Sequence, residues 1–147
     1  MIKNERQYRI TRSQIAKFET ALNAAAARSD VDPKLRKLET DALRSQLDEM
    51  RQEIDDYERL RDGEQGVIQL DSFDQLPQAL VQARIASGLS QKELAERLGM
   101  KEQQIQRYEA TDYASASMTR IKEVMVALGI SVAGHLTCSA AGRDDQV

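Results

Sequence analysis

In the N-terminal part of the chain, apolar residues recur at intervals of three and four, the period of an amphipathic helix. A first helix is predicted over residues 11–28, because Thr11 and Gln14 have the spacing of a capping box. A second helix is predicted from Pro33 to about Leu60, with Asp32 as its N-terminal cap. The apolar positions of the two helices are Ile15, Phe18, Leu22, Ala25, Leu35, Leu38, Ala42, Leu43, Leu47, Met50, Ile54 and Tyr57.

The short loop between these helices favours an antiparallel, coiled-coil-like hairpin over residues 1–62. Such a hairpin buries only a narrow stripe of apolar surface and therefore needs a partner surface. Self-association of the hairpin is the simplest interpretation, and binding of another protein is the alternative. A polar linker with two glycines is predicted over residues 63–72, within which residues 67–70 form either a short strand or an extended connector.

After the linker the pattern changes to short helices that end at glycines. Capping boxes at Ser72/Gln75 and Ser90/Glu93 predict helices that run to Gly88 and Gly99. Two further helices are predicted over about residues 101–110 and 117–128, and residues 131–136 could add a short helix or strand. The chain is therefore predicted to be all-α, with a compact four- to five-helix domain over residues 73–136 and a flexible tail over 137–147. Its inward positions are Leu76, Leu80, Ala83, Ile85, Leu94, Leu98, Ile105, Tyr108, Ile121, Val124, Met125 and Leu128.

Two of these helices, joined by a tight turn at Gly99, have the spacing of a helix-turn-helix, whose second helix enters the DNA major groove. Because Ile105 and Tyr108 share the inward face, the opposite face and the N-terminal end carry polar side chains. Gln can pair with adenine, Arg with guanine, and Glu can accept from cytosine. The predicted base contacts are Lys101, Glu102, Gln103, Gln106 and Arg107.

The identity of particular residues adds to the evidence from helix spacing. These residues are Arg84 to Gly99, then Ile105, Tyr108 and Glu109, and then residues 127–130. In this order they resemble the Cro and phage-repressor (XRE) helix-turn-helix family, over about residues 73–136. The resemblance implies that Gln91 holds a DNA phosphate, with Ser90 and Lys92 beside it. It also implies that Arg84 and Glu109 form a structural pair across the core. Tyr113 lies in a loop where the family contacts phosphate, and its hydroxyl is expected either to donate there or to cap the turn.

Two features depart from the family pattern. Lys101 replaces the usual Ser or Thr cap, and Glu102 places a negative charge where Gln or Arg is common. The segment 73–130 also holds as many acidic as basic residues, so one copy is expected to bind DNA modestly and with strong salt dependence. A homodimer would supply the missing affinity by placing two recognition helices about 34 Å apart on a palindromic site.

The amino-acid composition excludes several classes of protein. The 147 residues are 41% hydrophobic, 31% charged and 4% aromatic with a net charge of −3, which disfavours large enzymes and all-β folds. Cys138 and His135 are the single cysteine and histidine, so no metal site, cofactor or catalytic residue is predicted. No membrane span or signal peptide is recognised, and a cytoplasmic location is expected.

These observations predict a sequence-specific DNA-binding transcriptional regulator, without enzymatic activity, that represses as a homodimer on double-stranded DNA. One alternative is a HigA-like antitoxin, which would bind a cognate toxin protein through the N-terminal helices and repress its own operon. Another is an interaction module that has kept the fold but lost DNA binding, which Glu102 and the neutral charge of the domain favour.

Overall fold

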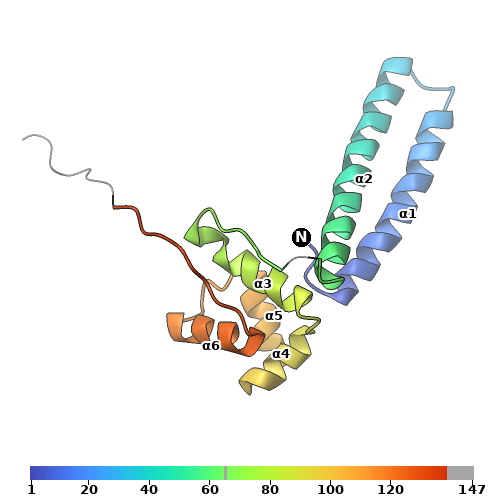
Figure 1. Cartoon of the computed structure of the whole chain (residues 1–147). Helices are drawn as coiled ribbons and strands as arrows, with labels where there is room; N and C mark the ends of the chain where they lie inside the picture. The colour runs from blue at the N-terminus through green and yellow to red at the C-terminus, as the bar shows by residue number, and fades with distance from the viewer. Residues whose placement is uncertain (65, 139–147) are drawn as a thin grey trace, which may run out of the picture.

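The computed structural model describes residues 1–64 and 66–138. The regular secondary structure in that part of the chain is entirely helical (Figure 1). The predicted all-α class is confirmed. A hairpin of two long helices extends away from a compact bundle of shorter ones (Figure 1). The elements are α1 (Glu5–Ala27), α2 (Pro33–Arg61), the 3₁₀ helix η1 (Phe73–Gln75), α3 (Leu76–Ala86), α4 (Gln91–Leu98), α5 (Glu102–Ala110) and α6 (Met118–Leu128).

Helix α1 begins earlier than the sequence pattern predicts. Its cap is Asn4, whose side-chain oxygen accepts a hydrogen bond from the backbone N–H of Gln7 at 2.9 Å. Thr11, the predicted cap, instead lies inside the helix and is buried. The prediction of a start at Thr11 was therefore wrong, because Asn4 already caps the helix about two turns upstream.

Helix α2 begins where predicted, with the Asp32 carboxylate accepting from the N–H of Lys34 at 2.8 Å. The two helices lie side by side and bury a narrow seam that includes Ala25, Thr40 and Leu47. Leu35 and Leu38, on the same helix, are 56% and 68% exposed. The hairpin therefore leaves apolar surface uncovered within a single chain, as its sequence pattern indicates.

The bundle α3–α6 encloses the main core. Leu94 of α4, Ile105 of α5 and Val124 of α6 are fully buried against one another's helices. At the predicted Ser72/Gln75 capping box, the single turn η1 forms before α3 begins. The Ser72 hydroxyl caps this turn by accepting from Asp74 N–H. Ser117 caps α6 by accepting from Arg120 N–H at 3.1 Å. The helices predicted between Ser72 and Gly129 are thus confirmed, with small shifts at their ends.

The segments that flank the bundle carry neither helix nor strand. Residues 66–70 form an extended connector, which decides between the two predicted alternatives. Residues 131–136 are exposed and irregular, and Leu136 is 99% exposed, so the added helix or strand was a wrong prediction. A short apolar run with no covering element does not form secondary structure on its own. The predicted flexible tail lies mostly outside the described residues.

The base of the hairpin packs directly on the bundle. Ile2, Tyr8, Tyr57 and Leu60 belong to the same buried cluster as the core of α3–α6. The rings of Tyr8 and Tyr57 stack with their centroids 5.2 Å apart. The hairpin is therefore anchored at its base, next to the helices expected to bind DNA, while its tip projects away from them (Figure 1).

Candidate nucleic-acid interface

The α4–turn–α5 unit is held by local signals at both ends of α4. Ser90 Oγ accepts from Glu93 N–H at 3.1 Å, and the Glu93 carboxylate accepts from Ser90 N–H at 2.8 Å, which completes the predicted capping box. The hydrogen bond from the Ser90 backbone lowers the pKa of Glu93. At the other end Gly99 has a φ of +64°, a left-handed conformation that favours glycine. These features determine where α4 begins and where it ends before the turn to α5.

The outward face of α5 carries all the predicted base contacts. Ile105 is fully buried and Tyr108 is partly buried, so the helix turns its polar residues toward solvent as predicted. The Gln106 amide donates to the Glu102 carboxylate at 3.3 Å, which joins two of these side chains one turn apart. Gln103 and Arg107 make no side-chain hydrogen bond within the described residues. The exposed residues of this face are Lys101, Glu102, Gln103, Gln106 and Arg107.

The helix begins without a side-chain cap from Lys101. Instead, the Gln104 side chain reaches back and accepts from the Lys101 backbone N–H at 3.2 Å. The lysine ammonium is therefore left outside the cap, at the exposed N-terminal end of α5. A cation at this end can approach a DNA phosphate, and Glu102 next to it carries the opposite charge.

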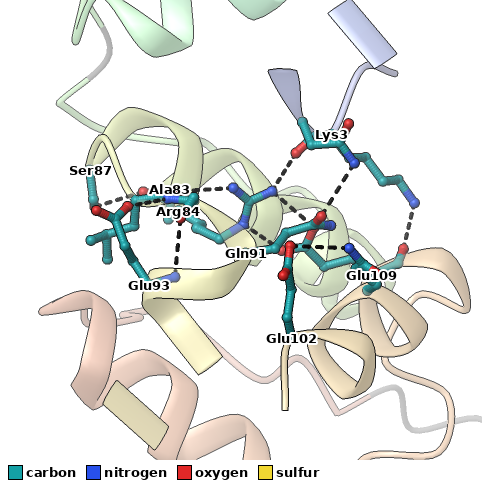
Figure 2. A network of polar contacts seen from close by, with 12 residues as sticks. Lys3, Ala83, Arg84, Ser87, Gln91, Glu93, Glu102 and Glu109 are labelled. Carbon is teal, nitrogen blue, oxygen red and sulfur yellow. Dashed lines mark hydrogen bonds and ion pairs between the residues drawn. The ribbon is translucent and has the colours of Figure 1, made fainter. Parts of the chain in front are cut away.

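Arg84 of α3 and Glu109 of α5 form a bidentate ion pair at the centre of the domain (Figure 2). Arg84 Nε lies 2.6 Å from Glu109 Oε1, and Nη2 lies 2.9 Å from Oε2. The residues are 2% and 1% exposed. Arg84 Nη1 also donates to the Leu89 carbonyl at 2.8 Å. Both charges are thus removed from water and compensated within the fold, in keeping with the structural role that the family resemblance implies.

Gln91, the first residue of α4, lies in the interior and not on the surface. It is 6% exposed, its amide nitrogen donates to Glu109 Oε2 at 2.7 Å, and its amide oxygen accepts from Asn4 at 3.2 Å. Both ends of the amide are therefore used within the protein. This geometry corrects the expectation of a side chain free to hold a DNA phosphate, because the sequence does not show that Asn4 lies over it.

The other residues expected at phosphates divide into two groups. Ser90 and Lys92 are exposed at the start of α4, although the Ser90 oxygen already accepts from Glu93 N–H. Tyr113 is only 3% exposed and stacks on Tyr108 with ring centroids 5.6 Å apart. Burial raises the pKa of the Tyr113 hydroxyl, with a further contribution from the Glu109 charge. The expectation that Tyr113 donates to a phosphate is corrected accordingly, since its hydroxyl faces the interior.

The N-terminal residues join the site, which the sequence analysis missed. Lys3 accepts from Arg84 through its carbonyl, and its ammonium donates to the Glu109 carbonyl at 2.5 Å (Figure 2). The second contact satisfies a carbonyl in the last turn of α5, where a cation is favourable. A signal was present, because Asn4 and Gln7 have cap spacing, but local patterns do not show which distant helix an N-terminus will contact.

The single histidine and the single cysteine lie apart from the α4–α5 surface, after α6. His135 and Cys138 are exposed in the irregular segment after α6. Within residues 1–64 and 66–138, no three His, Cys, Asp or Glu side chains are grouped as a metal ion would require. Across the same residues, none of the helices has the length and apolar character needed to cross a membrane.

Comparison with known proteins agrees with this geometry. Residues 80–134, which include α4, the turn and α5, match the family described as helix-turn-helix. No protein of curated function and no solved structure matches the chain. The match begins within α3 and leaves the N-terminal hairpin outside it.

Proposed function

Because residues 80–134 match the helix-turn-helix family, we propose that the protein is a DNA-binding transcriptional regulator that recognises a palindromic operator as a homodimer and represses transcription there. The observation that carries the proposal is the exposed polar face of α5, held outward by the buried Ile105. Its glutamines and Arg107 offer the donors and acceptors that base edges in the major groove require. Repression follows if the bound dimer occupies a promoter.

Selection of binding sites from a random DNA pool tests this function directly. The full-length protein should enrich a palindrome with half-sites about one helical turn, ~34 Å, apart. Titration of the enriched sequence at two salt concentrations separates specific from electrostatic binding. A well-folded protein that enriches no sequence would contradict the proposal and favour an interaction module.

Arg107 is the residue of this face from which we expect the clearest effect on specificity. Arg107→Ala should weaken binding to the selected operator by about 5- to 150-fold, the ~1–3 kcal/mol of one bidentate base contact. Binding to random DNA should change much less, because base contacts are not made there. Fluorescence anisotropy with both duplexes measures this difference.

The matched control for this experiment is Arg44→Ala on α2. Arg44 is exposed, and it lies 3.8 Å from Asp41 in a surface pair that contributes little. Arg44→Ala removes the same charge far from α5. Its affinities for the operator and for random DNA should therefore stay near those of the unmodified protein. Equal losses on operator and random DNA for Arg107→Ala would remove the base-contacting role assigned to this residue.

The exposed leucines of α2 support self-association through the hairpin. Leu35 and Leu38 lie three residues apart and therefore on one side of the helix, where no element within residues 1–64 and 66–138 covers them. Two such surfaces from two copies would bury apolar area that one chain leaves in water. Light scattering on full-length protein should thus give the mass of a dimer.

Substitution of the two leucines tests this interface. The Leu35→Glu/Leu38→Glu variant should be monomeric with unchanged helical content, because exposed residues contribute little to the folding of one chain. Ser13→Glu/Gln14→Glu adds the same charges at exposed positions of α1 and should remain dimeric. A dimeric leucine variant would place the interface elsewhere and leave the hairpin face free for another protein, such as a toxin.

A further inference from the structure

The burial of Gln91 raises the question of which residue holds the DNA backbone beside α4. In a helix-turn-helix the first helix of the motif crosses the backbone, so a phosphate is expected near the start of α4. The Gln91 amide is committed to Glu109 and Asn4 and is not available there. The first turn of α1 lies beside the start of α4, because Asn4 donates to the Gln91 amide oxygen. A residue of this turn, outside residues 80–134, can therefore make the phosphate contact.

A groove runs between the base of the hairpin and the exposed face of α5. Its walls include Arg6 and Gln7 of α1, Ser90 of α4, and Glu102 and Gln106 of α5. The start of α1 thus shares one surface with two of the predicted base contacts. A DNA strand that passes the start of α4 while α5 lies in the major groove would run along this groove.

The charges along the groove limit which residue can meet a phosphate. Glu5, Glu93 and Glu102 line it and would repel the DNA backbone unless a cation lies beside them. Of the basic residues in the walls, Lys3 and Arg84 are already engaged at Glu109. Arg61 packs over the ring of Tyr8, 5.2 Å from its centroid, and lies 3.6 Å from Asp62.

Arg6 is the remaining basic residue of the groove. It is exposed, and within residues 1–64 and 66–138 its side chain forms no ion pair or hydrogen bond. We propose that Arg6, at the start of the hairpin, binds a DNA phosphate and performs the backbone contact that Gln91 does not make. The proposal rests on the proposed DNA-binding function, and it gives the hairpin a direct part in that function.

Arg6→Ala in the full-length protein tests this contact. Removal of one phosphate contact should weaken binding about tenfold at ~0.1 M salt and reduce the slope of log affinity against log salt by about 0.9. The loss should be the same on the selected operator and on a random duplex of equal length, since a phosphate carries no sequence information. Arg6→Lys should retain part of the affinity because it keeps the charge.

Arg9→Ala is the matched control, because Arg9 is exposed on the same helix but does not line the groove. It removes the same charge and should leave affinity within about twofold, with the salt slope unchanged. Thermal melting and light scattering on each variant establish that fold and mass are the same. Arg6 has no partner in the described part of the chain, so its replacement should not lower the melting temperature.

Three results would overturn the proposal, and they are distinguishable. If Arg6→Ala and Arg9→Ala bind alike while the unmodified protein binds its operator, the regulator function stands and the Arg6 contact does not exist. If Arg6→Ala binds more tightly, the hairpin obstructs DNA at this groove. If the unmodified protein binds neither duplex, the proposed function itself fails.

Discussion

Glu109→Ala is expected to lower the free energy of unfolding by about 3–5 kcal/mol, because it leaves the buried Arg84 guanidinium without a counter-charge. The Glu109 carboxylate is 1% exposed and accepts from Arg84 Nε at 2.6 Å, Arg84 Nη2 at 2.9 Å and Gln91 Nε2 at 2.7 Å. Arg84 is 2% exposed, so its guanidinium is removed from bulk water and depends on partners within the fold. Urea unfolding followed by circular dichroism measures the change.

Glu123→Ala is the matched control for this prediction. Its carboxylate lies 2.7 Å from Arg120 one turn away on the surface of α6, where an ion pair contributes at most about 1 kcal/mol. If Glu109→Ala were no more destabilising than Glu123→Ala, the buried pair would not carry the stability assigned to it. Glu109→Gln keeps the shape and part of the hydrogen bonding, so it provides a measurable intermediate if the alanine variant does not fold.

The consequence of Glu109→Ala extends to DNA binding because the pair connects several elements. Arg84 belongs to α3, Glu109 to α5, and Gln91 joins them from the start of α4, while Lys3 reaches the same carboxyl-bearing turn from the N-terminus (Figure 2). The orientation of α5 therefore depends on the network. Operator affinity should fall even under conditions in which most of the Glu109→Ala protein is still folded.

The parts of this fold that were predictable from the sequence are those that local chemistry determines. Ser90 with Glu93, Asp32 before Pro33, and Ser117 each satisfy amides within three residues, so their effect is visible in the sequence order. The outward face of α5 follows from the helical period once Ile105 is taken as buried. This is why the predicted base contacts all lie on an exposed surface.

The two errors at the candidate site, Gln91 and Tyr113, concern surroundings that the local sequence pattern does not show. Asn4 and Gln91 are separated by 87 positions, and no periodicity links them, so the burial of Gln91 was not visible in the sequence. Tyr113 lies in a polar loop typical of the surface, yet its φ of +56° accompanies a ring stacked on Tyr108 and turned inward. The family resemblance supplied a position for Gln91 but not the N-terminal segment whose Asn4 covers it.

Leu47→Ala is the second substitution from which we expect a large loss of stability. Leu47 is 1% exposed and lies within the seam between α1 and α2, so truncation removes buried apolar surface and leaves a cavity. Such changes cost about 2–5 kcal/mol. Urea unfolding of Leu47→Ala beside Leu38→Ala, which truncates a 68% exposed leucine of the same helix, should show the loss in the first variant only when it is measured at a concentration where the protein is monomeric.

The same pair of variants separates the folding of the hairpin from its association. Leu38→Ala alters the proposed contact between copies, so it should weaken the dimer without loosening the single chain. Leu47→Ala acts inside the chain. Any loss of dimer mass in this variant should result from local unfolding of the hairpin and should therefore increase with temperature. If Leu38→Ala lowered chain stability as much as Leu47→Ala at a concentration where both are monomeric, the exposed face would have a folding role and the proposed interface would lose its support.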